Sequence, residues 1–261
     1  MNMVSTKLQL DLDGHLAVIT GATGQLGRVM ARTLAACGAD VVVHYHQNAA
    51  KAAELCDEIK GMGRRTLAVS GDVGQKADVF ALRDQVVAQV GAPDIIVTNA
   101  VSQIHPWQTV LEEEEEDYED QFRSCVLQNV FFAKAFAPAM IERKWGRFIG
   151  INTECSMQLF KNQSAYGGAK RAMDGVMRVL AKEIGSHQIT VNQVAPGWTI
   201  SDRDRERGSE HNERYESTVP LARRGTDQEI ANVVAFLASD LASFITGAYI
   251  PVCGGNVMPT I

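Results

Sequence analysis

The sequence has little of what marks secreted, membrane-spanning or nucleic-acid-binding chains. Its five cysteines are odd in number and form no C-x-x-C pair, so reduced thiols are expected, without a disulfide framework or a zinc site. The start, "MNMVSTKLQLDLDG", has no apolar h-region, and no run approaches about 18 uninterrupted apolar residues. A net charge of −6 argues against bulk nucleic-acid binding. These absences favour a cytoplasmic enzyme with no metal, no membrane contact and no nucleic-acid partner.

The chain does have enough apolar residues for one substantial core, with 46% hydrophobic residues in a length of 261. Short β-branched runs, which read as strands, lie at 15–20, 40–45, 65–70, 94–100, 146–153, 189–196 and 248–252. Amphipathic segments between them predict helices at 25–37, 48–62, 75–90, 117–144, 164–185 and 227–238. The alternation predicts an α/β fold: a single-domain Rossmann-type doubly wound parallel sheet over residues 1–261, with helices on both faces. Ligands of such sheets bind at the carboxyl ends of the strands.

An acidic run, "LEEEEEDYED", covers residues 111–120. Carboxylates are favourable at a helix N-terminus, so we interpret the run as a solvated loop and first helical turn. No histidine or spaced carboxylate pattern accompanies it, which disfavours a metal site.

A glycine-rich turn, "TGATGQLG", follows the first predicted strand. Glycine at 21, 24 and 27 lets the backbone approach a pyrophosphate, which the free N–H groups and positive dipole of the next helix would bind. The position between strand and helix makes this a dinucleotide site rather than a simple turn. The cofactor contacts expected here are Gly21, Thr23, Gly24, Gln25, Leu26 and Gly27.

The tip of the second predicted strand, "VVVHYHQN", lacks the acid that would accept the ribose 2′-hydroxyl of NAD. Tyr45 occupies that position and His46 follows, so nothing repels a 2′-phosphate. We therefore expect NADP(H) to be favoured over NAD(H). Two later turns, after the third and fourth predicted strands, should complete the cofactor site with Asp72, Val73, Asn99, Ala100 and Val101.

Tyr166 and Lys170 are four residues apart at the start of a predicted helix, which places both on one face. A nearby ammonium stabilises a phenolate, so we expect Lys170 to lower the pKa of Tyr166 and make it usable as an acid or base. Thr153 lies thirteen residues upstream, where its hydroxyl could orient a substrate carbonyl.

This ordered set of motifs resembles the compact branch of the short-chain dehydrogenase/reductase family, with a pattern closest to 3-oxoacyl-[acyl-carrier-protein] reductases. The resemblance covers nearly the whole chain and includes "TNAV" (98–101), Y-x-x-x-K, "VAPGWT" (194–199) and "TGAYIPVCGG" (246–255). It implies hydride transfer between a nicotinamide and an alcohol or carbonyl carbon. Tyr166 would be the general acid in reduction, Lys170 its partner and also a contact of the nicotinamide ribose, and Thr153 the orienting hydroxyl.

The resemblance also implies how the substrate end is built. Pro196, Gly197, Trp198 and Thr199 would pass beside the nicotinamide, and residues 199–220 would cover the substrate. Ile104, Trp107, Phe160 and Trp198 are the candidates for an apolar pocket. The arginines of the covering segment are either a clamp for an anionic substrate or a self-paired surface, and the substrate itself stays open.

A homotetramer, or failing that a homodimer, is expected by the same resemblance. The apolar faces that would self-associate, or else simply cover the sheet, carry Phe122, Val126, Phe132, Phe136, Met173 and Met177.

Four positions depart from the family pattern. Gln25 replaces the middle glycine of the turn, Thr153 stands where serine is commoner, and Cys253 interrupts the usual V-D-G-G. Cys125 stands where an asparagine usually holds a relay water; Asn129 lies one turn away, and Ser156 is a fallback for Thr153. These departures keep open a nucleotide-binding sensor or partner subunit, and, less favoured by length, a sugar-nucleotide epimerase or dehydratase.

Overall fold

The computed structural model describes residues 10–102 and 108–259, and these fold around one parallel sheet. The sheet has seven strands in the order β3-β2-β1-β4-β5-β6-β7. The strands are β1 (Leu16–Ile19), β2 (Asp40–Tyr45), β3 (Thr66–Ser70), β4 (Ile95–Thr98), β5 (Gly146–Ile151), β6 (Ile189–Pro196) and β7 (Tyr249–Val252). The doubly wound sheet expected from the sequence is confirmed.

The central strands are buried on both faces, which explains their continuous apolar runs. All four residues of β1 are buried, and Val18 pairs with Val42 on one side and Ile96 on the other. A strand order that reverses between β1 and β4 leaves a crevice at the carboxyl ends of these two strands.

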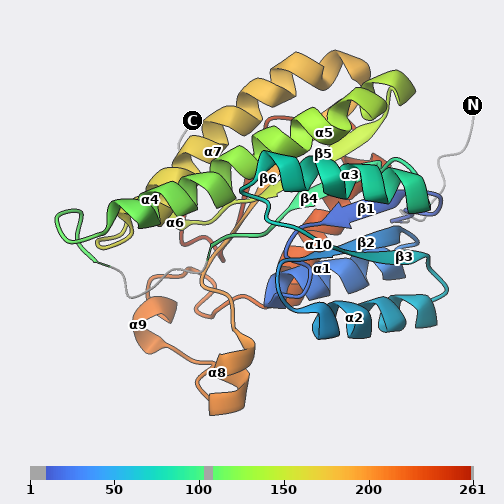
Figure 1. Ribbon diagram of the computed structural model, residues 1–261. Coiled ribbons are helices and arrows are strands. Elements are labelled where there is room, and N and C mark those ends of the chain that lie inside the picture. Colours follow the sequence, from blue (N-terminus) through green and yellow to red (C-terminus); the bar gives the residue numbers. More distant parts are fainter. Residues whose placement is uncertain (1–9, 103–107, 260–261) are drawn as a thin grey trace, which may run out of the picture.

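Helices cover both faces of the sheet. Figure 1 shows α1, α2 and α10 on one face and α3, α5 and α7 on the other. The helices are α1 (Gln25–Ala36), α2 (Ala49–Gly61), α3 (Lys76–Val90), α4 (Glu115–Phe122), α5 (Gln128–Arg143), α6 (Cys155–Gln158), α7 (Ser164–Ile184), α8 (Asp202–Arg207), α9 (Glu213–Glu216) and α10 (Asp227–Ala238). Helices α8 and α9 project beyond the carboxyl edge of the sheet, at the lower left of Figure 1.

The long helix expected at 117–144 is interrupted. A π-helical turn, Arg123–Leu127, separates α4 from α5. Side chains bind the helix's own carbonyl oxygens here: Ser124 Oγ donates to Asp120 O at 2.8 Å, and Asn129 Nδ2 donates to Cys125 O at 2.7 Å. Such side-chain insertion into the backbone ladder is a recognised cause of a local break in a helix.

The same helical run, Glu115–Arg143, is long and apolar enough to cross a membrane by length and composition alone. The sequence pattern did not indicate this, because charged and polar residues interrupt the apolar run. Its apolar window is 61% buried, because α5 packs between α3 and α7 against the sheet. It therefore has the character of a core helix.

The apolar faces considered for self-association are mostly internal. Phe132, Phe136, Met173 and Met177 are all buried within the core on the α3–α5–α7 side. Val126 joins the same core, whereas Phe122 is exposed. These residues cover the sheet, which was the alternative interpretation of the pattern.

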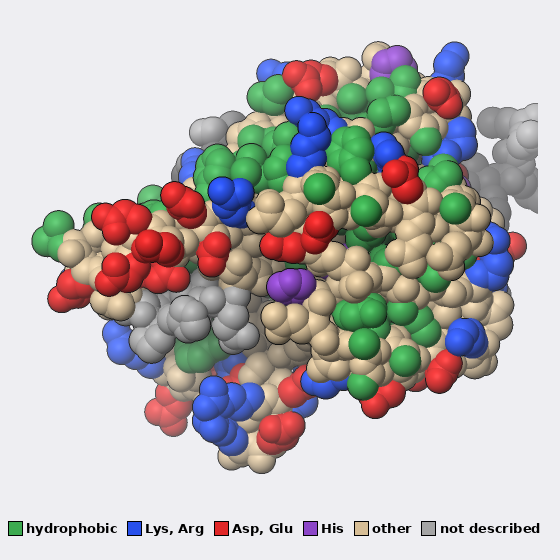
Figure 2. Space-filling model, viewed as in Figure 1, with side chains coloured by type: hydrophobic (Ala, Val, Ile, Leu, Met, Phe, Trp, Pro, Cys, Tyr) green, Lys and Arg blue, Asp and Glu red, His purple; other side chains and the backbone are tan. Residues whose placement is uncertain are grey.

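The acidic run forms the loop before α4 and the first turn of that helix. Figure 2 shows acidic side chains gathered over this end of the molecule, at the left of the view. Glu114, Glu115 and Glu116 are exposed and have carboxylate oxygens within 4.8 Å of one another. They face solvent, as a helix N-terminal acidic turn would.

Candidate active site

A long groove lies at the carboxyl edge of the sheet and consists of two adjoining cavities of about 1010 and 990 Å³. Gln25, Leu26, Asn99 and Val101 line both cavities, so they mark the junction. The second cavity extends over β2 and β3, and the first reaches the α8–α9 segment, which we define as residues 199–220. The groove gathers these predicted site residues: Gly21, Thr23, Gly24, Gln25, Leu26, His46, Asp72, Val73, Asn99, Ala100, Val101, Thr153, Tyr166, Lys170, Pro196, Gly197, Trp198 and Thr199.

Two predicted cofactor contacts lie outside the groove lining. Tyr45 packs against the core on the α1–α2–α10 side, so the side chain at the tip of β2 that faces the groove is His46 instead. Gly27 is buried inside α1 beneath the turn.

The glycine turn makes a cradle that side chains would fill. Gly21 has φ +61°, and a Cβ there would lie 3.1 Å from Ala100 Cα. A Cβ on Gly27 would clash sterically with the Gly21 carbonyl oxygen. Helix α1 starts with Gly24 as N-cap, without a side-chain cap and without an acid in its first turn. Its N–H groups and dipole therefore suit a dinucleotide pyrophosphate.

Thr20 ties this turn to the loop after β4. Its buried hydroxyl accepts the backbone N–H groups of Asn99 and Ala100 at 2.8 and 2.9 Å and donates to Gln128 Oε1 at 2.7 Å. Asn99 Nδ2 returns a bond to Thr20 O at 2.9 Å, so the side chain of Asn99 helps to fix the turn.

His44 supports the cofactor half of the groove from below, a residue that the sequence did not single out. Its Nδ1 accepts the N–H of Gly21 at 3.1 Å, which puts the ring proton on Nε2, 3.1 Å from Gly71 O. Burial lowers the pKa of His44 to about 4. A neutral imidazole thus links the β1 turn to the β3 turn.

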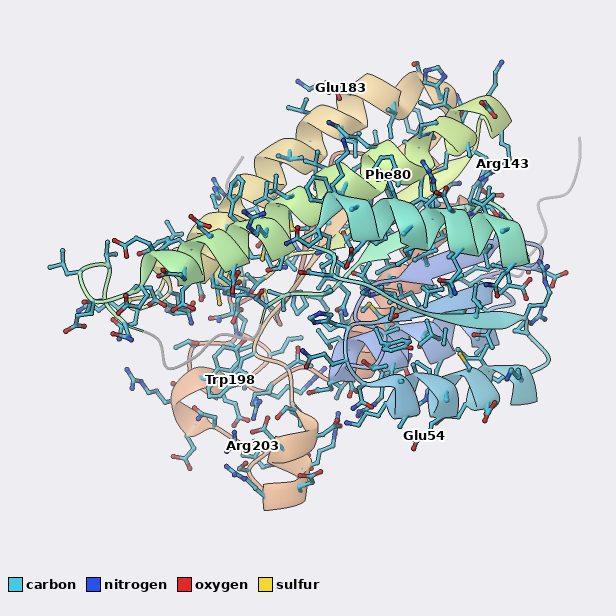
Figure 3. All side chains as sticks on the ribbon, in the orientation of Figure 1. Glu54, Phe80, Arg143, Glu183, Trp198 and Arg203 are labelled. Carbon is cyan, nitrogen blue, oxygen red and sulfur yellow. The ribbon has the colours of Figure 1, made fainter. Side chains whose placement is uncertain are left out.

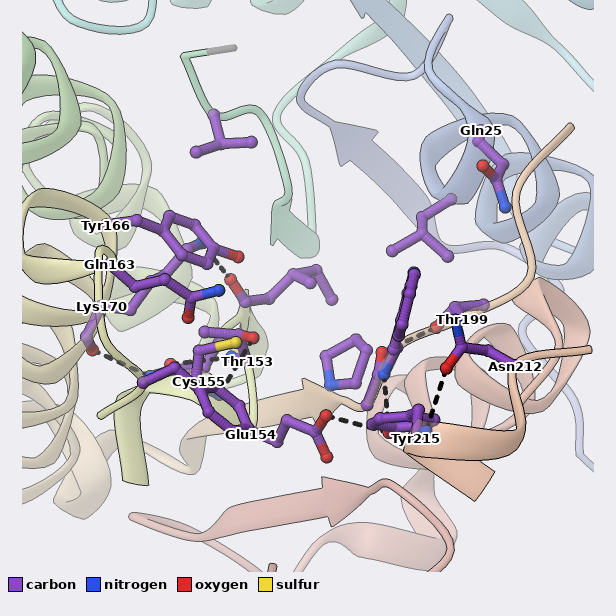
Figure 4. A pocket seen from close by; sticks show the side chains of 18 of the residues that line it. Gln25, Thr153, Glu154, Cys155, Gln163, Tyr166, Lys170, Thr199, Asn212 and Tyr215 are labelled. Carbon is purple, nitrogen blue, oxygen red and sulfur yellow. Dashed lines mark hydrogen bonds between the residues drawn. The ribbon is translucent and has the colours of Figure 1, made fainter. Parts of the chain in front are cut away.

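Thr153, Tyr166 and Lys170 converge on the first cavity from two elements. Thr153 follows β5 and Tyr166 and Lys170 share one face of α7 (Figure 4). Lys170 is 3% exposed, and its Nζ lies 5.8 Å from the centre of the Tyr166 ring. The amide of Asn152 holds this corner together, because it donates to Lys170 O at 3.1 Å and accepts the N–H of Thr153 at 2.8 Å.

The expected lowering of the Tyr166 pKa is wrong for the protein without cofactor. Burial is the largest influence and raises the pKa of Tyr166, while a hydrogen bond with the Thr153 side chain acts in the opposite direction. Lys170 directs its Nζ to Ile151 O at 2.6 Å. Spacing alone brought the ammonium close to the ring but did not fix where it would donate.

The departures from the family pattern have visible consequences. Cys125 is fully buried, with its Sγ 3.7 Å from Gln121 Oε1, and its carbonyl oxygen is occupied by the amide of Asn129. Ser156, the fallback for Thr153, is buried away from the groove, where its hydroxyl donates to Thr153 O at 2.9 Å. Thr153, by contrast, lines the first cavity.

Glu154 joins the wall of the first cavity to the α8–α9 segment and was not predicted. It is 2% exposed, and its two carboxylate oxygens accept bonds from Tyr215 Oη at 2.9 Å and Asn256 Nδ2 at 3.0 Å (Figure 4). Burial raises the pKa of this carboxyl group, and both hydrogen bonds oppose that rise.

Arg224 organises the α8–α9 segment from inside. It is 2% exposed, forms an ion pair with Asp204 at 2.7 Å, and its guanidinium donates to the carbonyl oxygens of Trp198, Thr199, Ser209 and Glu210. Trp198 stacks on it, with 4.6 Å between guanidinium carbon and ring centre. Figure 3 shows Trp198 between the sheet and helices α8 and α9.

The segment is also fastened to the phosphate end of the groove. Gln25 Nε2 donates to Ile200 O at 2.6 Å, and Arg28 pairs with Asp202 at 2.5 Å. The residue that departs from the glycine pattern therefore links the start of α1 to the α8–α9 segment.

Of the expected apolar wall, Phe160 and Trp198 line the first cavity, and both are about half exposed. Ile104 and Trp107 lie outside the described residues.

A parallel sheet with a glycine cradle at its crevice, and a threonine, tyrosine and lysine gathered beside it, defines a dinucleotide-dependent oxidoreductase. A family model described as "Enoyl-(Acyl carrier protein) reductase" matches residues 21–256. The 3-oxoacyl-[acyl-carrier-protein] reductase FabG of Staphylococcus aureus is 36% identical, over 93% of this chain and 98% of the relative. The protein belongs to the short-chain dehydrogenase/reductase family of NAD(P)-dependent oxidoreductases.

Solved structures agree with this assignment. A gluconate 5-dehydrogenase of Burkholderia cenocepacia, in complex with NADP and tartrate, is 28% identical with a TM-score of 0.86, over 95% of this chain and 97% of that one. A blue fluorescent protein from a metagenomic library, in complex with NADPH, is 29% identical with a TM-score of 0.87, over 95% of this chain and all of the other.

Proposed function

We propose that the protein interconverts a carbonyl group and a secondary alcohol, with Tyr166 as the residue that donates the proton in reduction and accepts it in oxidation. The observation that carries the proposal is the convergence of Thr153, Tyr166 and Lys170 on a cavity that adjoins the glycine cradle. A bound nicotinamide supplies or accepts the hydride. Thr153 would hold the substrate oxygen beside the Tyr166 hydroxyl, and Lys170 would stabilise the phenolate and bind the nicotinamide ribose.

The raised pKa of Tyr166 fits the direction of reduction. A buried phenol keeps its proton until an alkoxide develops beside it, and an alkoxide is basic enough to take that proton. In oxidation the phenol must first lose its proton, so reduction should be the easier direction near neutral pH.

We propose NADP(H) as the favoured cofactor. His46, Gln47 and Asn48 line the groove at the end of β2, and none of them is acidic. A phosphate on the ribose 2′-oxygen would meet the hydrogen-bonding groups of these three residues, while the acids of the same cavity, Asp72 and Asp120, lie on other elements. Two of the similar solved structures carry NADP or NADPH.

We propose that residues 1–261 form a single NAD(P)-binding domain, in which the α8–α9 segment acts as a lid over the substrate. The bonds from Glu154, Arg224 and Gln25 to this segment support a covering role. A homotetramer or homodimer in the cytoplasm is the expected setting, since Phe122 and Val179 leave apolar surface exposed on α4 and α7.

A nucleotide-binding sensor is the second candidate. Cys125 stands where the family pattern has an asparagine that holds a relay water, and its carbonyl oxygen accepts a hydrogen bond from Asn129. Gln25, in the glycine turn, donates a hydrogen bond to the proposed lid at Ile200 O. A sensor would bind NADPH and close the segment without turnover.

The test measures loss of the reduced-nicotinamide absorbance with NADPH and a panel of small ketones, keto acids and 3-oxoacyl thioesters. Tyr166→Phe should lower kcat about 10²–10⁴-fold while the Kd for NADPH stays unchanged. Glu183→Gln, at an exposed site near the end of α7, is the matched control. Unchanged turnover in Tyr166→Phe would refute the assignment of the acid, and NADPH binding without turnover of any substrate would favour the sensor.

A further inference from the structure

The substrate end of the groove carries an arginine that no described acid neutralises. Three charged residues line the first cavity: Glu154, Lys170 and Arg214. Lys170 donates to Ile151 O, and both oxygens of Glu154 accept bonds from Tyr215 and Asn256. Within residues 10–102 and 108–259, the guanidinium of Arg214 has neither an ion pair nor a hydrogen bond.

The other arginines of the α8–α9 segment do not share this position. Arg205 pairs with Asp202 and Asp227, and neither Arg203 nor Arg207 lines the cavity. Figure 3 labels Arg203 on α8. The segment contains four arginines and six acids, so it provides no general positive field that could attract anions. The position of Arg214 is what distinguishes it.

The surroundings of Arg214 are polar and structured. Asn212 and Thr218 line the cavity on the same segment, and Asn212 Oδ1 fixes the short helix α9 by accepting the N–H of Tyr215 at 3.0 Å. Tyr215 is in turn bonded to Glu154, next to Thr153. This chain of contacts sets the position of Arg214 relative to the proposed reacting carbonyl. On the opposite wall, the buried Oε1 of Gln163 accepts no hydrogen bond from a described residue.

Resting on the oxidoreductase function proposed above, we propose that the carbonyl substrate carries an anionic oxygen group, a carboxylate or a phosphate, which Arg214 binds. The carbonyl would lie at Thr153 and Tyr166, and the anionic group at the end of the cavity formed by α9. A guanidinium presents a planar set of donors that matches carboxylate and phosphate oxygens, and a hydrogen bond between charged groups is stronger than one between neutral groups.

The test compares each anionic substrate with its uncharged counterpart, using the full chain and NADPH. Acetoacetate, 4-oxopentanoate and 5-oxohexanoate are measured against their methyl esters, and dihydroxyacetone phosphate against dihydroxyacetone. The keto acids and the phosphate distinguish a carboxylate from a phosphate as the anionic group. The three keto acids differ in the number of carbons between carbonyl and carboxylate, so they report the distance that the site requires between these two groups. We expect kcat/KM to favour the anion about tenfold or more in at least one pair.

Arg214→Met should reduce that preference to within about twofold, mainly through KM, because the charge-assisted bond is lost from substrate binding. Arg214→Lys should restore part of it. Arg203→Met, an exposed arginine of the same segment outside the cavity, should leave it unchanged. Equal use of the anionic compound and its uncharged counterpart in all four pairs, or a preference that persists in Arg214→Met, would overturn the proposal. A larger Kd for NADPH in Arg214→Met, with an unchanged preference for anionic substrates, would also overturn it, since Arg214 would then bind the cofactor.

A binding measurement separates this proposal from the function on which it rests. In Tyr166→Phe with NADPH bound, the anions should still quench nicotinamide fluorescence, and the double variant Tyr166→Phe/Arg214→Met should lose that response. Arg214-dependent binding without turnover in the wild type would support the anion site and refute the oxidoreductase function. Absence of anion binding in Tyr166→Phe would refute the anion site, whether or not other carbonyl compounds are reduced.

Discussion

The two halves of the groove are held together by different interactions. On the cofactor side, neutral groups join the strands: His44 bridges Gly21 and Gly71, and the Thr20 hydroxyl accepts two backbone N–H groups. On the substrate side, charged pairs fasten a segment that projects from the sheet, through Arg28 with Asp202 and Arg224 with Asp204.

From this difference we expect the cofactor half to be rigid and the α8–α9 segment to be able to open. The side chains of His44 and Thr20 are buried, so breaking their bonds would leave polar atoms unpaired away from water, and the glycine turn should keep its position without cofactor. Ion pairs at the surface contribute little, because water solvates both partners when they separate. The buried guanidinium of Arg224 is the exception, and it makes the α8–α9 segment a cooperative unit rather than a loose loop.

The largest difference between the two halves of the groove should follow from replacing Arg224. Arg224→Met removes the guanidinium from four carbonyl oxygens and from Asp204, which among the described residues keeps only its bonds from Ser201 and Ser209, and breaking a buried pair of this kind costs about 3–5 kcal/mol. We expect the loss to appear as opening of residues 199–220, measured by faster amide hydrogen exchange there, with little change in β1, β2 and β3. Arg223→Met, a half-exposed neighbour paired with Glu229, is the control. Equal exchange in the two variants would contradict the account.

On the cofactor side, acid should loosen the fold through His44. Its pKa of about 4 lies below the ordinary 6.5, so the unfolded chain binds the proton more readily. The contribution of His44 is therefore complete above about pH 6.5 and is lost as the pH falls through 4, by about 3 kcal/mol in total.

Urea unfolding at pH 7, 6, 5 and 4 measures this loss. His44→Gln, which cannot titrate, should remove about that much of the pH dependence. His211→Gln, an exposed histidine, should leave it unchanged. A slope in His44→Gln equal to that of the wild type would show that other groups govern the acid sensitivity.

The smallest expected effect concerns cofactor choice. His46→Asp places a carboxylate where the 2′-phosphate of NADP is expected, so the ratio of kcat/KM for NADPH to that for NADH should fall about tenfold or more. His46→Asn is the uncharged control and should change the ratio less. A ratio that does not respond to the aspartate would place the adenosine ribose elsewhere in the groove.

Much of the fold could be predicted from the sequence, because buried parallel strands have continuous apolar runs and the glycine turn follows the first of them. The strand-end positions then placed Thr153, Asn99 and Trp198 on one groove. The parallel sheet and the two helical layers follow from the alternation of strand and helix patterns, whereas the strand order comes from the structure.

The sequence could not show what depends on contacts between distant residues. Hydrogen bonds with Gly21 and Gly71 orient the ring of His44, and hydrogen bonds from Tyr215 and Asn256 orient the carboxylate of Glu154. These partners are 23 to 102 positions away in the sequence. The pKa of Tyr166 failed as a prediction for the same reason, since burial by the assembled fold raises it and outweighs the opposing hydrogen bond with Thr153. The break at Cys125 depends on side chains that bind the carbonyl oxygens of their own helix.

Direct transfer of hydride is the central claim, and isotope transfer tests it most directly. The protein would be supplied with NADPH deuterated at C4, in separate 4R and 4S forms, and a carbonyl compound that it reduces. The account predicts that one form delivers its deuterium to the new carbinol carbon of the alcohol, seen as a product heavier by one mass unit, while the other form does not. A product without deuterium from both forms would contradict it.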